Sequence, residues 1–381
     1  MMKQIEKNEK KQSALDILFF FMLLSGTILF GCNNKMDSID SVKVDLNICN
    51  DVGLSEIAEN VKCIPLETTD NCIIDRIIKV KTMEGQIYIS DTYHVFQFNA
   101  DGGFVKQIGR KGRGPGEYQL IYDFCLNRFN KTINLLTSTG IIQYDENNNF
   151  IKSVPVEGFP HTIETIDNLI YITSEYFNLK STSGHRNISW LYKYSNNLEL
   201  IDSINIANVS ITKVFAFHQP LTFNFSLSLN NIFFYQPNFL IEPIIRDTLY
   251  RFNNNSFEPY FRFDFGEEEA EFIRQQRIED GFPYKKLNIL NMYKASDYIF
   301  MEYNIDSKSY LGFYNQQNKV YYNTISGLDD DIYKTGKIIP LPLNDSEFQM
   351  YFRKYAYEVQ DIFKNVSEND NPIIFLIKLK K

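Results

Sequence analysis

Charged side chains set among glycines give the clearest local hint of chemistry in this 381-residue chain. The segment 108–118 reads IGRKGRGPGEY, with four glycines between positions 109 and 116. Glycines free backbone N–H groups to cradle an anion, and Arg110 and Arg113 could bind a carboxylate or sulfate through paired hydrogen bonds. The alternative interpretation is a tight crossover between two structural units, where glycine permits close backbone approach. The segment lacks the lysine–serine ending of a nucleotide-binding phosphate loop.

Carboxylates occupy corresponding places in three of the sequence repeats described below, at Asp91, Glu175 and Glu302. If the β-rich segments that precede these three carboxylates line a central channel, the carboxylates converge at one mouth of that channel. They could then act with a central cation. The alternative is that they are hydrated residues at strand ends. Arg246 precedes an Asp-Thr turn and adds a further cation. The ligand-binding candidates are therefore Asp91, Arg110, Arg113, Arg246 and Glu302.

Motifs of known catalytic type do not occur in the chain. The four histidines are scattered, and neither H-E-x-x-H nor G-x-S-x-G is present. We therefore expect a protein without catalysis, with no assigned catalytic residue, no bound metal and no cofactor. A propeller hydrolase or lyase that uses axial carboxylates with a cation is the alternative. Three or more converging carboxylates with a metal would favour the enzyme, and a broad aromatic face would favour binding.

A five-fold repeat defines the elements that must position these residues. Each copy is a β-rich run, an aromatic residue, a polar turn and a second β-rich run. The aromatic residues recur at steps of 46, 50, 58 and 62, close to the roughly 40–50 residues of a four-stranded propeller blade. These aromatic anchors are Phe98, Tyr144, Tyr194, Phe252 and Tyr314.

The repeat predicts an all-β fold, a six-bladed β-propeller that occupies residues 42–381 as one domain. A closed ring should not end on an unpaired edge, so the strand expected at 372–380 should pair with strands from 42–68 to make a sixth blade. Five blades are expected at 74–110, 118–156, 161–206, 211–265 and 294–325. The composition agrees, with 15% aromatic residues.

Two segments break the β pattern and predict helical insertions. Residues 267–280 begin with acids, which suits the positive end of a helix. Residues 344–366 carry apolar side chains at steps of three and four, as on one helix face. The second segment is expected to pack on the rim of the ring, with docking of a partner as the alternative.

The N-terminus predicts export and lipid anchoring. Residues 1–16 are lysine-rich, and 17–31 form an uncharged run of the length of a signal-peptide core. The ending Leu29-Phe30-Gly31-Cys32 resembles the lipobox of bacterial lipoproteins. That resemblance implies a signal peptide at 1–31, lipid attachment at Cys32 and a tether at 32–41. An uncleaved signal anchor, with Cys32 as an ordinary residue, is the alternative.

Four further cysteines could pair in an exported chain, in three ways. They lack C-x-x-C spacing, and free buried thiols are the favoured interpretation. These are Cys49, Cys63, Cys72 and Cys125.

The glycine segment also carries a family resemblance. Together with 64–69 (IPLETT), 247–250 (DTLY) and Asn371-Pro372-Ile373, it resembles the six-bladed β-propeller lipoproteins of Gram-negative bacteria, which are distantly NHL-like. The resemblance spans about residues 61–380. Most members have no established activity, so it implies fold and cell-envelope location more than function.

These observations predict a lipid-anchored cell-envelope protein, on the outer membrane, that binds a ligand or partner through the loop face of a propeller. The expected ligand is an anionic sugar or a peptide terminus held by the arginines, and an envelope protein is another expected partner. A formal net charge of −8 without a long basic run argues against nucleic acid.

Overall fold

The structure is a computed structural model that describes residues 39–181, 184–211, 224–228, 231–235, 247–253, 255–266, 287–305, 308–343 and 345–380. The chain divides into two compact units, Met1–Asp40 and Ser41–Lys381. The predicted signal peptide, Cys32, Arg246 and the predicted helix at 267–280 lie outside the described residues.

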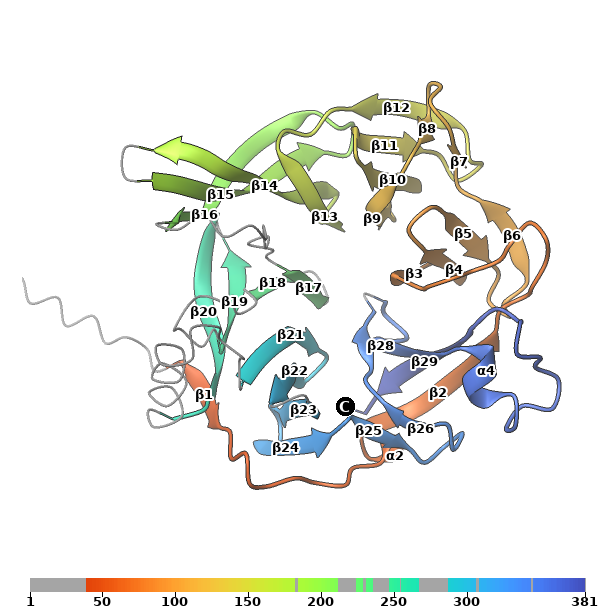
Figure 1. Ribbon diagram of the computed structural model, residues 1–381, viewed down its shortest axis with the longest axis vertical. Helices are drawn as coiled ribbons and strands as arrows, with labels where there is room; N and C mark the ends of the chain where they lie inside the picture. Colours follow the sequence, from red (N-terminus) through yellow and green to blue (C-terminus); the bar gives the residue numbers. More distant parts are fainter. Residues whose placement is uncertain are drawn as a thin grey trace, which may run out of the picture. The chain divides into compact units, whose positions relative to one another are not determined.

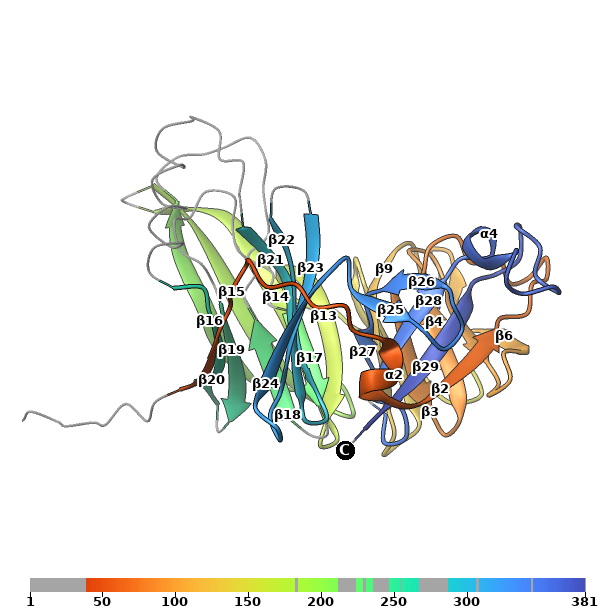
Figure 2. The same cartoon turned by 90° about the horizontal axis from the view of Figure 1, so that it is seen from below.

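Six antiparallel sheets surround a common axis in the unit Ser41–Lys381, which confirms the predicted six-bladed propeller (Figures 1 and 2). Each blade is numbered in chain order, and its strands are given from the axis outward. Blade 1 is β3 (Lys79–Met83), β4 (Gln86–Ser90), β5 (Val95–Phe98) and β6 (Phe104–Gln107). Blade 2 is β9 (Ile121–Asn127), β10 (Thr132–Thr137), β11 (Gly140–Tyr144) and β12 (Phe150–Val154). Blade 3 is β13 (Phe159–Ile166), β14 (Leu169–Ser181), β15 (Gly184–Ser195) and β16 (Leu200–Ile211).

The remaining blades follow the same order. Blade 4 is β17 (Asn224–Ser228), β18 (Asn231–Tyr235), β19 (Thr248–Asn253) and β20 (Ser256–Asp264). Blade 5 is β21 (Leu287–Ala295), β22 (Tyr298–Ile305), β23 (Lys308–Asn315) and β24 (Val320–Ile325). Blade 6 is β27 (Leu341–Pro342), β28 (Met350–Lys354), β29 (Ile373–Leu379) and β2 (Ala58–Pro65).

The ring closes as predicted, because the C-terminal strand pairs with an N-terminal one. β29 is antiparallel to β2, with Val61 opposite Ile377 and Ile64 opposite Ile374, and it also pairs with β28. The earlier strand β1 (Asp40–Lys43) does not join blade 6; it is a fifth strand beyond β20 in blade 4.

Short elements complete the described fold. They are two two-stranded sheets, β7 (Arg110–Lys111) with β8 (Glu117–Tyr118) and β25 (Leu328–Asp330) with β26 (Gly336–Ile338), and two one-turn helices, α2 (Leu54–Ile57) and α4 (Ala356–Val359).

The repeated aromatic residue and the polar turn after it each have a structural cause. The aromatic residue is the last or next-to-last residue of the third strand of its blade, and its ring is buried at Phe98, Tyr144 and Tyr194. The next side chain closes the turn: Asp145 Oδ1 accepts hydrogen bonds from the backbone N–H groups of Asn147 and Asn149. Asn99, Ser195 and Asn315 make equivalent pairs of bonds, because short polar side chains mimic a backbone turn.

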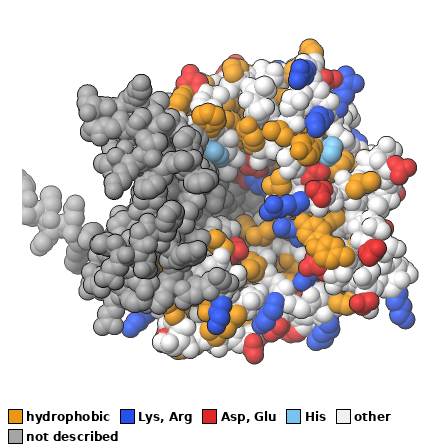
Figure 3. All heavy atoms as spheres, viewed as in Figure 1, with side chains coloured by type: hydrophobic (Ala, Val, Ile, Leu, Met, Phe, Trp, Pro, Cys, Tyr) orange, Lys and Arg blue, Asp and Glu red, His pale blue; other side chains and the backbone are white. Residues whose placement is uncertain are grey.

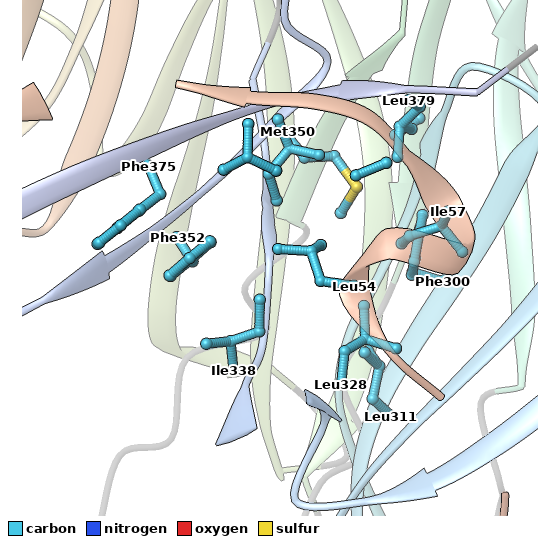
Figure 4. Close-up of a cluster of buried hydrophobic side chains, with 14 of the residues drawn as sticks. Leu54, Ile57, Phe300, Leu311, Leu328, Ile338, Met350, Phe352, Phe375 and Leu379 are labelled. Carbon is cyan, nitrogen blue, oxygen red and sulfur yellow. The ribbon is translucent and has the colours of Figure 1, made fainter. Parts of the chain in front are cut away.

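Apolar side chains fill the seams between blades. One cluster joins blades 5 and 6, and α2 places Leu54 and Ile57 into it beside Leu328 and Met350 (Figure 4). In blade 6, Phe352 and Phe375 stack with ring centroids 4.3 Å apart. Contacts of this kind close the ring at its terminal blade.

The predicted helix over 344–366 was wrong. Residues 350–354 form the strand β28, and the helical part is only α4, residues 356–359. Met350, Tyr351 and Phe352 are all buried, because β28 lies between β27 and β29 and both of its faces are covered by neighbouring blades. A strand buried on both faces has no alternation to identify it, so the apolar spacing resembled a helix face.

The condition that the β-rich run opening each repeat lines the axial channel is not met. Those runs are the second strands, such as β4 and β14, and a preceding strand of each blade lies nearest the axis. The inner strand β3 joins β4 through Glu84-Gly85, both with positive φ, as in a tight hairpin turn that matches strand twist.

The described cysteines are all free thiols, as the sequence favoured: Cys49, Cys63, Cys72 and Cys125. Burial raises the pKa of Cys72 and of Cys125 to about 12, so these two thiols are not nucleophiles at neutral pH.

Candidate binding site at the mouth of the axial channel

Four charged side chains on the inner strands of blades 1–3 form an ion-pair cluster. Lys79 Nζ on β3 lies 2.7 Å from Asp123 Oδ1 on β9 and 2.9 Å from Glu164 Oε1 on β13. Lys81 Nζ lies 2.6 Å from Glu164 Oε2. The cluster therefore ties three consecutive blades together beside the axis.

Ionisation in this cluster is set by the competition between burial and opposite charge. Burial acts to lower the pKa of Lys79, but the charges of Asp123 and Glu164 outweigh it and raise the pKa above its usual value. Burial acts to raise the pKa of Glu164, and the two lysines outweigh it and hold that pKa low. Burial raises the pKa of Asp123 against the attraction of Lys79. Both oxygens of Asp123 also accept backbone N–H bonds, from Phe124 and Ile163.

The inner strands of blades 2, 3 and 5 each contain a β-bulge near their first residues. Asp123 and Ile121 face successive residues of β10, so Tyr122 is the extra residue of β9. His161 is the extra residue of β13, and Leu290 that of β21. Bulges re-aim side chains and are common at barrel rims and beside functional sites.

These bulges lie at the end of the ring where the inner strands begin, which we call the upper face; Figure 3 views this face. The picture shows a hollow in the middle of the face, with hydrophobic side chains along part of its edge and charged ones beside them. Tyr122 is 42% exposed, Tyr93 43% and Phe159 60%. Ile78 and Leu120 are exposed next to the starts of β3 and β9. We call Tyr93, Tyr122 and Phe159 the aromatic collar.

Two carboxylate–histidine pairs accompany the aromatic collar. Asp91 Oδ2 lies 3.0 Å from His94 Nδ1, and Asp91 Oδ1 accepts the backbone N–H groups of Tyr93 and His94. Glu175 Oε2 lies 3.7 Å from Nε2 of His161, and burial lowers the pKa of this histidine. The predicted site residue Asp91 thus shapes the turn that presents Tyr93.

Glu302 lies on β22 in blade 5, opposite Asn291 of β21. It is half-buried, and burial raises its pKa. Asp91, Glu175 and Glu302 therefore stand on three different blades, and the first two each have a histidine of their own. Within the described ranges, no three His, Cys, Asp or Glu side chains are grouped so that they could hold a metal.

The glycine segment makes contacts that support the crossover interpretation. Glu117 Oε1 accepts a hydrogen bond from Arg110 Nε at 2.6 Å, and Glu117 Oε2 accepts one from the backbone N–H of Gly114. Arg113 is exposed on the same segment. The cation that lies against the aromatic collar is Lys111, whose Nζ is 4.3 Å from the centre of the Tyr93 ring. Ligand binding by Arg110 and Arg113 stays a prediction, as it does for Arg246.

Sequence reasoning missed the residues that the structure brings together. The ion-pair cluster lies on strands that precede the repeated β-rich runs, where the sequence repeat is weakest. Alternation in Lys79-Val80-Lys81 was the available signal, since both lysines had to share one face of a strand. No local signal marked the bulges that aim Tyr122 and His161.

The fold and this site define a class: a six-bladed β-propeller with a hollow in the middle of one face. Comparison with known families makes this more specific. The family described as a domain of unknown function, DUF4934, matches residues 39–378, so the chain belongs to this family. No curated protein matches the chain.

Among solved structures, the chain is similar to a protein of Bacteroides fragilis NCTC 9343 that carries the provisional description of an exported protein. The TM-score is 0.63 at 18% identity, over 90% of this chain and 100% of that one, which supports the shared fold. An acylaminoacyl peptidase (TM-score 0.41, 9% identity, 73% of this chain and 48% of that one) and the N-terminal domain of Nup159 (0.41, 8%, 83% and 80%) are more distant.

Among the described residues, no helix is both long enough and apolar enough to span a membrane.

Proposed function

We propose that this protein is an exported, lipid-anchored propeller of the cell envelope that binds a ligand at the mouth of its axial channel, without transforming it. The observation that carries the proposal is the pair of adjacent bulges on β9 and β13, which present Tyr122 and His161 at the upper face. Ligands commonly bind at such mouths, where several structural units meet.

The aromatic collar supports binding over catalysis. Its three aromatic side chains are all exposed at the upper face, and apolar surface exposed together marks interaction sites. The axial carboxylates Asp123 and Glu164 are held by lysines, and Asp91 is held by His94 and by backbone donors. These three carboxylates are engaged within the protein, whereas a hydrolase or lyase would need carboxylates directed at a substrate, so we favour binding.

The binding function is tested by a screen of defined glycans and peptides against the mature protein. We expect the double variant Tyr122→Ala, Phe159→Ala to weaken binding of the tightest ligand by about 2 kcal/mol or more, which is roughly a 30-fold increase in Kd. The reason is that aromatic anchors buried in an interface dominate its binding energy. Phe129→Ala is the matched control, since Phe129 is 68% exposed in the turn at the opposite end of β9.

Two results of this screen would contradict the proposal. One is the absence of any ligand for the wild-type protein in the whole panel. The other is equal weakening by the control and by the collar variant. The double variant Arg110→Ala, Arg113→Ala should leave affinity unchanged if the glycine segment is only a crossover, and a loss there would assign it to the site.

The lipid anchor has its own test. Cys32→Ser should move the protein from the membrane fraction to a soluble fraction, because the thiol that carries the lipid is gone. Cys49→Ser is the matched control, since Cys49 is an exposed free thiol and should leave the protein on the membrane. Unchanged membrane retention of Cys32→Ser would indicate an uncleaved signal anchor instead.

A further inference from the structure

The spacing of the aromatic collar indicates what kind of ligand it receives. Tyr122 and Phe159 stand near the first residues of the inner strands of two neighbouring blades. These strands are directly linked, because Asp123 Oδ2 accepts the backbone N–H of Ile163 at 2.9 Å. Both side chains are exposed, Tyr122 at 42% and Phe159 at 60%, so two neighbouring blades each offer an aromatic face to a ligand. A ligand made of repeating flat units suits such a row.

The ion-pair cluster at the mouth is balanced within itself, and further carboxylates lie around it. Lys79 and Lys81 face Asp123 and Glu164, two cations against two carboxylates. Elsewhere on this face, Arg110 is paired with Glu117, and Lys111 lies over the ring of Tyr93. Asp91, Glu175 and Glu302 add carboxylates on blades 1, 3 and 5, and an acidic ligand would meet their negative charge. The described groups therefore disfavour an acidic ligand.

The polar groups beside the collar suit hydroxyl groups. Asp91 faces His94 Nδ1, and this carboxylate favours the tautomer that carries the proton on Nδ1. His94 then offers Nε2 as a hydrogen-bond acceptor from a half-buried position. The phenol oxygens of Tyr93 and Tyr122 both donate and accept hydrogen bonds. Flat apolar faces with donors and acceptors at their edges are the surfaces that a sugar ring requires.

From this arrangement we infer that the ligand is an uncharged glycan, a chain of neutral sugars that stacks on Tyr122 and Phe159 across blades 2 and 3. The inference rests on the proposed binding function and names its ligand class. Tyr122 and Phe159 are the residues that determine this preference, because they supply the exposed aromatic faces. His94 beside them supplies a hydrogen bond to a ring hydroxyl.

Calorimetric titration of the mature protein tests the ligand class. The probes are cellohexaose, maltohexaose, mannohexaose and N-acetylchitohexaose, an oligogalacturonate as acidic glycan, and neutral and acidic hexapeptides. We expect one or more neutral hexasaccharides to bind, with Kd weakened at least tenfold by Tyr122→Ala and by Phe159→Ala. Tyr122→Phe keeps the ring and should retain most of the affinity, and Phe129→Ala should retain all of it.

Salt dependence gives an independent readout. Affinity for a neutral glycan should change less than twofold between 50 and 500 mM NaCl, because screening acts on charges. Binding confined to the oligogalacturonate and weakened by salt would overturn the inference. Peptide binding that is lost in the collar variants would overturn the ligand class and leave the binding function intact. No binding by any probe would overturn both.

Discussion

Deletion of residues 372–381 should abolish the cooperative unfolding transition of the propeller. The deleted segment contains β29, which pairs with β2 on one side and β28 on the other. Its removal leaves two strand edges unpaired and uncovers the hydrophobic seams on both sides of blade 6, and exposed edges are sites of aggregation. Thermal and urea unfolding followed by circular dichroism should show a broad transition or an aggregated product.

A graded variant separates this effect from simple truncation. Phe375→Ala removes a buried ring that stacks on Phe352 and should cost about 3–5 kcal/mol. Tyr357→Ala is the matched control, because Tyr357 is 62% exposed on α4, and it should change stability by less than about 0.5 kcal/mol. A truncated protein that unfolds cooperatively at the parent temperature would contradict closure by both termini.

Lys79→Met should destabilise the protein by about 3–5 kcal/mol. The substitution leaves Asp123 without its ammonium partner and Glu164 with only Lys81, and removing one partner of a buried pair leaves an uncompensated charge. Urea unfolding at neutral pH measures the change. Lys62→Met is the control: its ion pair with Asp101 is long, at 4.0 Å, and exposed, so it should cost about 0–1 kcal/mol.

A second variant identifies the cause of the loss. Lys79→Met with Asp123→Leu removes both partners of the closest pair, so part of the lost stability should return. If the double variant is as unstable as the single one, packing of the lysine stem rather than charge explains the effect. If Lys79→Met costs no more than Lys62→Met, the cluster does not tie the blades together.

The fold could be predicted because its signal is local and repeated. The aromatic anchors lie at strand ends, and after four of them the next side chain closes a turn within four residues, as Asp145 does for Asn147 and Asn149. Closure by the C-terminal strand followed from the need to cover an edge. Strand order within a blade was harder, because inner strands such as β3 contribute lysines to the axis and lack the β-rich composition of the second strands.

The site was less predictable, for two physical reasons. Ion pairs such as Lys79 with Glu164 join residues on different blades, and no spacing in the sequence encodes that contact. A bulge shifts one side chain without changing composition, so Tyr122 and His161 look like ordinary strand residues. By contrast Asp91 was identified by its place in the repeat, although its contacts show a turn-forming role beside the mouth.

The central claim is that the upper face of blades 1–3 binds the ligand. Hydroxyl-radical footprinting of the mature protein, with and without a saturating amount of the tightest-binding probe from the glycan and peptide panel, tests it most directly. We predict that oxidation falls at Tyr93, Tyr122 and Phe159 and stays unchanged at Phe129 and Tyr357. Protection at Phe129 with none at the three collar residues would contradict the claim.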